Sequence, residues 1–157
     1  MSSEITHVGL AVPNLDQAMQ WYCSVLGFYI LSGPTEFDAA EAEVENITQN
    51  LQGPEIKKMR NVHLMSMGGV GIELFEFREA DLDEGPPTAH RGFFHICLIV
   101  ENVVEAIERI VQHGGKQRSQ IHQMNKDKNH YLVYTEDLFG NILELSSRST
   151  SEMYSNR

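Results

Sequence analysis

Two histidines and two glutamates stand at matching places in a chain that repeats one pattern. His7 enters one apolar run and His95 enters another, while Glu73 and Glu144 each lie between aliphatic residues. A carboxylate in a mostly apolar strand is costly unless a metal or a positive partner satisfies it. Two imidazoles and two carboxylates that converge would suit a divalent metal with positions open to water or substrate.

The spacing of these residues strengthens the interpretation. The histidines are 88 positions apart and the glutamates are 71 apart, and the difference of 17 matches extra length in the Ala- and Glu-rich stretch 35–60. We interpret this stretch as an insertion, which is either an exposed loop or a lid over a site. A single strand histidine is more often a satisfied structural residue than a ligand. Recurrence of the same histidine and glutamate within a repeat favours the role of metal ligand.

The elements of the first repeat follow from its hydrophobic pattern. A strand is predicted over 5–12, followed by a helix whose capping box is formed by Asn14 and Gln17 and whose end is at Gly27. A strand over 28–31 stops at the turn 32–34, and a weak amphipathic helix is predicted over 38–51. The strands 61–67 and 72–77 form a hairpin around the glycine-rich turn 68–71.

The second repeat has the same order of elements. A strand over 93–100 leads to a helix capped by Asn102 and Glu105 and stopped at 114–115. Weak strands near 116–123 precede strands over 131–135 and 142–145. Each unit is therefore a strand, a helix and three more strands.

We expect a single domain over 1–157 that is made of two modules. The first module spans 4–78 with the insertion 35–60, a polar linker spans 79–90, and the second module spans 91–147. The tail 148–157 is predicted to be loose or to form a partner-dependent arm.

Strand alternation assigns side chains to faces. If the aliphatic neighbours of both glutamates face the helices, both carboxylates face the other side of the sheet. Phe75 and Phe77 share the face of Glu73, so we expect them to line a pocket. Glu76 lies on the opposite face and is predicted to be solvated or at a strand edge. Cys97 shares the face of His95, so it lies either near the metal or, in the interpretation that we favour, within the core as a small buried side chain.

Composition excludes several classes of partner. The formal net charge of −10 argues against nucleic acid and anionic membranes, because both require a basic face. No apolar run approaches the roughly 20 residues of a membrane span, and the N-terminal residues lack a signal pattern. Two cysteines form no disulfide framework, which favours a cytoplasmic protein.

The four-residue pattern, the order of the elements and the segment 136–145 (EDLFGNILEL) resemble the vicinal oxygen chelate superfamily. That superfamily includes glyoxalase I, methylmalonyl-CoA epimerase, extradiol dioxygenases and bleomycin-type resistance proteins. The resemblance covers residues 5–147 and implies an α+β fold, in which two tandem βαβββ modules form a cupped mixed sheet around one metal. His7, Glu73, His95 and Glu144 match the complete ligand set of glyoxalase I.

By this resemblance we expect a metal-dependent, lactoylglutathione-lyase-like lyase or isomerase acting on a small molecule that chelates through adjacent oxygens. Glu144 and Glu73 would be both ligands and catalytic bases, and the cofactor would be one divalent ion, Zn, Ni, Co, Mn or Fe. Arg60 and Tyr134 join Phe75 and Phe77 as candidate pocket residues. The alternatives are an epimerase, an extradiol-type dioxygenase and a non-enzymatic binding protein. A homodimer is expected, with the site built within one chain or swapped between two.

Overall fold

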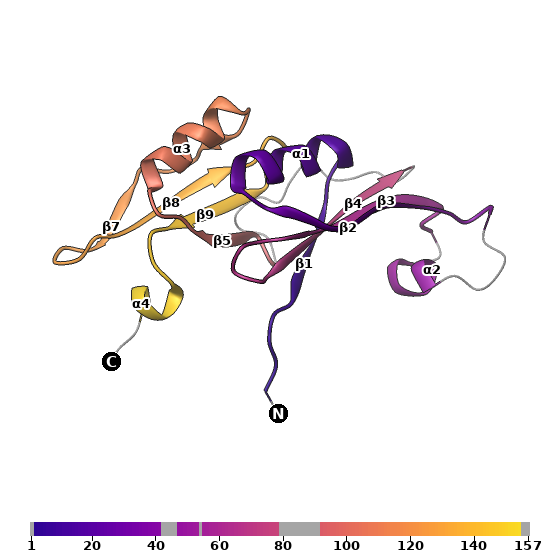
Figure 1. Ribbon diagram of the computed structural model, residues 1–157, viewed down its shortest axis with the longest axis horizontal. Coiled ribbons are helices and arrows are strands. Elements are labelled where there is room, and N and C mark those ends of the chain that lie inside the picture. The colour runs from indigo at the N-terminus through magenta and orange to yellow at the C-terminus, as the bar shows by residue number, and fades with distance from the viewer. Residues whose placement is uncertain (1, 42–46, 54, 79–91, 155–157) are drawn as a thin grey trace. The chain divides into compact units, whose positions relative to one another are not determined.

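The structure is a computed structural model that describes residues 2–41, 47–53, 55–78 and 92–154 (Figure 1). The chain divides into two compact units, residues 1–82 and 83–157. The expected linker 79–90 lies outside the described residues.

The first unit has the element order that the sequence predicts. Its elements are β1 (His7–Ala11), α1 (Leu15–Leu26), β2 (Tyr29–Asp38), α2 (Ile47–Gln52), β3 (Lys58–Met65) and β4 (Gly71–Arg78). The strands form a sheet in the order β1-β4-β3-β2, in which β1 runs parallel to β4 and the other pairs are antiparallel. The sheet is therefore mixed, and α1 packs against β2, β3 and β4.

Local signals set both ends of α1. The side chain of Asn14 accepts a hydrogen bond from the backbone N–H of Gln17 at 2.9 Å, as the capping pattern predicts. Gly27 ends the helix in the left-handed region with φ of 75°. One face of the helix is buried against one face of the sheet. This core includes Leu15, Ala18, Tyr22, Val25, Val62, Leu64, Ile72 and Leu74.

The second unit repeats the plan with one more strand than expected. Its elements are β5 (His95–Ile99), α3 (Val103–Gln112), β6 (Lys116–Gln117), β7 (His122–Asn125), β8 (His130–Glu136), β9 (Ile142–Ser146) and α4 (Thr150–Tyr154). The sheet order is β5-β9-β8-β6, and β7 also pairs with β8. Asn102 caps α3 as predicted, because its side chain accepts from the backbone of Val104 and Glu105. The α+β class with a mixed sheet in each module is confirmed.

Two expected boundaries differ most from the structure. β2 does not stop at 32–34 but continues to Asp38, because register shifts between Ile30 and Thr35 let the strand bend and keep pairing with β3. Within the expected helix 38–51, the described helical residues are those of α2, and 42–46 lie outside the described residues. The tail contains the helix α4, whose first turn is capped by Ser149 and Glu152.

In the described parts of the chain, no helix has the length and apolar character needed to cross a membrane.

Candidate metal centre

In the first unit, His7 and Glu73 approach each other on one face of the sheet. The parallel register pairs His7 with Gly71 and Gly9 with Glu73, which brings both side chains to the same side. His7 Nε2 lies 3.7 Å from Glu73 Oε2. The Glu73 side chain is 15% exposed, whereas that of His7 is half exposed. The unit therefore presents an imidazole and a largely buried carboxylate on the sheet face away from α1.

The second unit repeats this pair at the same register positions. His95 pairs with Ile142 and Cys97 pairs with Glu144, as His7 pairs with Gly71 and Gly9 with Glu73. His95 Nε2 lies 3.2 Å from Glu144 Oε2. The other ring nitrogen of His95, Nδ1, is buried without a hydrogen-bond partner among the described residues. Nε2 is therefore the nitrogen through which His95 reaches its carboxylate.

The donor pairs fit a divalent ion in type and in spacing. Imidazole nitrogen and carboxylate oxygen are ligands that zinc-class ions accept, at about 2.0–2.2 Å each. Two neighbouring ligands at that distance lie about 3.0–3.6 Å from each other. The 3.2 Å separation in the second unit falls inside this range, and the 3.7 Å separation in the first lies just outside it. Small side-chain movements would bring either pair onto an ion.

Within the residues that the structure describes, no group of three or more His, Cys, Asp or Glu side chains is arranged to hold a metal ion. Each unit supplies a histidine and a glutamate. The combination of both pairs in one centre stays a prediction.

Two neighbours of Glu73 were not singled out by the sequence. His63 is the cross-strand partner of Glu73, and its Nε2 lies 3.4 Å from Glu73 Oε1. Asn61 donates from Nδ2 to the same oxygen at 2.7 Å. His7 approaches the other oxygen, so the two imidazoles lie on different sides of the carboxylate with ring centroids 6.3 Å apart. Counting outward from the predicted turn 68–71 would have paired Ser66 with Glu73. The connection in the structure is 66–70, so Met65 lies opposite Gly71 and His63 opposite Glu73.

Glu144 has different neighbours. Tyr134 is its cross-strand partner and hydrogen-bonds to it. Burial raises the pKa of the Tyr134 phenol, and the charge and hydrogen bond of Glu144 raise it further.

The thiol of Cys97 donates to Glu144 Oε1 at 3.4 Å. Partial burial of the sulfur and the nearby carboxylate raise the pKa of Cys97 to about 12. Cys97 as a whole residue is exposed, which corrects its interpretation as buried.

The C-terminal helix also comes near this carboxylate. Burial raises the pKa of Tyr154 in α4, and the negative charge of Glu144 raises it further. The described part of the tail is therefore helical over Thr150–Tyr154 and comes near Glu144.

The aromatic pair predicted to line a pocket does share the face of Glu73. Phe75 and Phe77 stack with ring centroids 5.6 Å apart and planes tilted by 2°. Phe75 is 9% exposed, and a Cβ at Gly9 would lie 3.5 Å from its Cε2 atom. They form an apolar wall beside Glu73 on β4.

Arg60 lies on the opposite face of the first sheet from Glu73. Its register partner is Glu76, and it forms a bidentate pair with Asp16 on α1, with both N···O distances 2.9 Å. Glu76 Oε2 accepts from the backbone N–H of Leu15 at 2.7 Å. Glu76 is therefore a largely buried helix cap on a central strand, which corrects its expected placement as solvated or at an edge.

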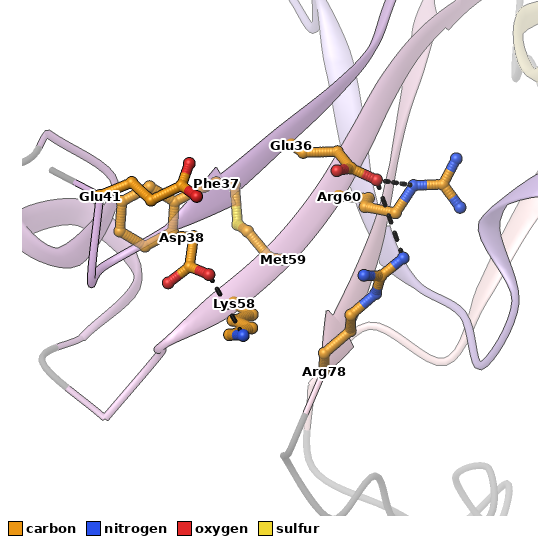
Figure 2. Close-up of a pocket in the computed structure, with 8 residues that line it drawn as sticks. All are labelled: Glu36, Phe37, Asp38, Glu41, Lys58, Met59, Arg60 and Arg78. Carbon is orange, nitrogen blue, oxygen red and sulfur yellow. Dashed lines mark ion pairs between the residues drawn. The ribbon is translucent and has the colours of Figure 1, made fainter.

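A cavity of about 170 Å³ lies at the end of β2, β3 and β4, and neither His7 nor Glu73 lines it. Its walls carry ion pairs of Lys58 with Asp38 at 3.2 Å, and of Arg60 and Arg78 with Glu36 at 3.1 and 3.8 Å (Figure 2). Because its cations and anions neutralise one another, we assign these side chains to holding the strand ends together.

The family model that matches the chain is that of the glyoxalase/bleomycin resistance protein/dioxygenase superfamily, and the match spans residues 4–145. The chain belongs to this superfamily. The expected resemblance is confirmed, and its boundaries include both His–Glu pairs.

Solved structures support the glyoxalase fold. A glyoxalase family protein from Bacillus cereus is 18% identical with a TM-score of 0.79, covering 93% of this chain and 94% of that one. Glyoxalase I from Zea mays is 21% identical with a TM-score of 0.62, covering 92% of this chain and 44% of that one. The trypanothione-dependent glyoxalase I of Leishmania major is 21% identical with a TM-score of 0.55, and the match covers 92% of this chain and 86% of that one. A sequence comparison with curated proteins finds no match.

The likeness to these structures shows the glyoxalase fold, and the chemistry depends on the residues of this chain. The sheet face that carries Glu73 in the first unit is the one away from α1, and the face that carries Glu144 in the second unit is the one away from α3. Members of the superfamily typically bind a divalent metal, and the donor pairs described above are suited to one.

Proposed function

We propose that the protein is a metal-dependent lyase or isomerase of the glyoxalase type, acting on a small molecule that has two adjacent oxygens. One observation carries the proposal. A His–Glu pair recurs at the same register positions in both units, with His Nε2 facing a Glu oxygen each time. In a superfamily that contains metalloenzymes, such a duplicated donor pair supports a metal centre built from both.

The ligands in this proposal are His7, Glu73, His95 and Glu144. The histidines would bind through Nε2 and the glutamates through one carboxylate oxygen. A bound divalent ion, Zn, Ni, Co, Mn or Fe, would supply Lewis acidity to the two substrate oxygens. The net charge of −10 attracts cations to the protein as a whole.

The chain's own carboxylates would move the proton. Glu144 or Glu73 would take the proton from the hydroxyl-bearing carbon next to a substrate carbonyl and return it to the carbonyl carbon, while the hydroxyl proton passes to the neighbouring oxygen, so that the product is an isomer of the substrate. The phenol of Tyr134, hydrogen-bonded to Glu144, would hold that carboxylate in place. Phe75 and Phe77 would exclude water beside Glu73.

Arg60 does not enter the proposed substrate site. Its guanidinium is engaged by acidic side chains on the other sheet face. An anionic carrier such as glutathione would therefore need other cations. This favours a small oxygenated substrate over a large thiol conjugate.

The test is metal analysis of protein purified without added metal, followed by titration with Ni, Zn, Co and Mn. We expect one ion per chain, and loss of binding in His7→Ala and in His95→Ala. The loaded protein is then assayed with α-ketoaldehydes, with and without a thiol, for isomerisation of the thiol adduct to a thioester or of the hydrate to a 2-hydroxy acid. Failure to bind any of these ions would contradict the proposal. If the iron-loaded protein consumes oxygen in the presence of a catechol, the dioxygenase alternative would replace the proposed lyase or isomerase.

A further inference from the structure

Glu73 is held by a chain of side chains that crosses three strands. Thr35 on β2 donates its hydroxyl hydrogen to Asn61 Oδ1 on β3. Asn61 in turn donates from Nδ2 to Glu73 Oε1 on β4 at 2.7 Å. This relay leaves Glu73 Oε2 to face His7. The second carboxylate oxygen is therefore the one available to an ion beside His7.

The chemistry of the groups determines the orientation of the Asn61 amide. An ionised carboxylate can only accept hydrogen bonds, so it must face the NH₂ group of the amide. That leaves Oδ1 turned toward Thr35, whose hydroxyl can donate. Removal of the hydroxyl would free the amide to rotate, and with it the donor that holds Glu73.

The backbone of β2 is shaped to deliver Thr35. Register shifts on either side of Ser32 bring Thr35 opposite Asn61 in the ladder. Gly33 lies between Ser32 and Thr35 along the chain, and its φ is 97°. A Cβ at Gly33 would meet the backbone carbonyl oxygen of Asn61 at 3.0 Å. Only glycine allows β2 to pass this close to β3 with that backbone conformation. The bulge in β2 therefore places the Thr35 hydroxyl beside the Asn61 side chain.

The second unit holds Glu144 differently. In the register of β8 and β9, Leu132 occupies the place that Asn61 has in β3 and β4, since each lies two residues before the partner of the glutamate. The donors that reach Glu144 are the thiol of Cys97, which is a weak donor, and the phenol of Tyr134. The amide relay is thus particular to Glu73 in the described residues.

We propose that Thr35 and Asn61 act together as positioning residues that hold the Glu73 carboxylate in the orientation of a metal ligand. This inference rests on the proposed metal centre. Groups that hydrogen-bond to a ligating carboxylate fix its geometry, and their removal commonly lowers metal affinity about 10–100-fold. Thr35 acts only through Asn61, so the two residues are predicted to be coupled.

The experiment measures Co(II) and Ni(II) affinity by calorimetry, and the visible absorption of the Co(II)-loaded protein, for the parent chain and four variants. Asn61→Ala is expected to weaken binding about 10–100-fold and to change the Co(II) spectrum. Thr35→Val, which keeps the side-chain shape, is expected to weaken binding less. Thr35→Ser, which keeps the hydroxyl, is expected to restore parent affinity and spectrum.

The double variant Thr35→Val/Asn61→Ala tests the coupling. It is expected to bind as Asn61→Ala alone does, because Thr35 has no effect once the amide is gone. Additive losses in the double variant would overturn the relay. Unchanged affinity and spectrum in Asn61→Ala would overturn the role of Asn61.

The outcomes separate this inference from the proposed function. A parent chain that binds Co(II), loses it in His7→Ala and keeps it in Asn61→Ala would overturn the inference alone. A parent chain that binds no ion would overturn both. Thr35 is exposed, so Thr35→Val is expected to fold even if Asn61→Ala does not, and an unchanged affinity in it would also count against the relay.

Discussion

At the scale of single residues, the two glutamates that the repeat makes equivalent have different surroundings. Glu73 accepts a short hydrogen bond from the amide of Asn61, while Glu144 is approached by a thiol and a phenol. Glu144 is 8% exposed as a residue, so its charge is poorly solvated. Equivalent places in the repeat therefore do not give the two carboxylates the same hydrogen-bond donors.

Replacement of Glu144 is the sharpest single-residue test. Glu144→Gln keeps the size of the side chain but removes a negative ligand and the proposed base. We expect weaker Co(II) binding by calorimetry and a loss of turnover of about 100-fold or more. The circular dichroism spectrum should stay that of the parent protein.

The matched control is Glu108→Gln on the exposed face of α3. It should change neither metal binding nor turnover. Parent-like metal affinity in Glu144→Gln would remove Glu144 from the ligand set.

At the scale of elements, α1 is attached to its sheet by charge as well as by its apolar face. Glu76 reaches from β4 to the first N–H of the helix, and Arg60 reaches from β3 to Asp16. The free N–H groups of a helix start are stabilised by a carboxylate at that end. Together these contacts hold the helix start over β3 and β4.

We predict that Glu76→Ala destabilises the first unit without affecting metal binding. Loss of a carboxylate that caps Leu15 and pairs with Arg60 should lower the free energy of unfolding by about 1–3 kcal/mol. Urea unfolding gives this value. Glu108→Ala, exposed on α3, serves as the control. Equal stability of the two variants would contradict the capping role of Glu76.

The Asp16–Arg60 pair should make stability depend on acid pH. The hydrogen bond from Arg60 holds the pKa of Asp16 below its ordinary value of 3.8. The contribution of the pair is therefore fully present above pH 3.8 and is lost as the pH falls through the lowered pKa of the folded state.

The measurement is urea unfolding of the parent protein and Asp16→Asn across this pH window. The stability difference between them should shrink as the pH falls below 3.8. A difference that stays constant throughout that window would show that the charge of Asp16 does not contribute.

At the scale of the whole molecule, the proposed centre links metal binding to folding. An ion that binds only the native state stabilises it by about 2.7 kcal/mol when its concentration is about 100 times its dissociation constant. We expect a Co(II)- or Zn(II)-dependent rise in the unfolding temperature that a chelator reverses. If both units contribute ligands to one ion, His7→Ala and His95→Ala should each abolish the rise. A rise that survives in His95→Ala would instead assign the ion to the first unit alone.

Much of the site could be predicted from the sequence because its signals are local. A strand alternates its side chains with a period of two, so the aliphatic neighbours of Glu73 and Glu144 determine which face each carboxylate takes. Asn14 and Asn102 mark the starts of α1 and α3 through hydrogen bonds to residues two or three positions away. The two modules and their four candidate ligands followed from these short-range rules and from the repeat.

Only the tertiary structure decided the partners that come from distant segments. Arg60 looked available for substrate, but the packing of α1 places Asp16 beside it, 44 positions away. Asn61 and Thr35 gave no signal, because their contact depends on the bulge in β2, and a shift of one residue in that register would turn the hydroxyl away. Short-range periodicity places a side chain on a face, whereas the packing of helices and strands determines which groups it meets there.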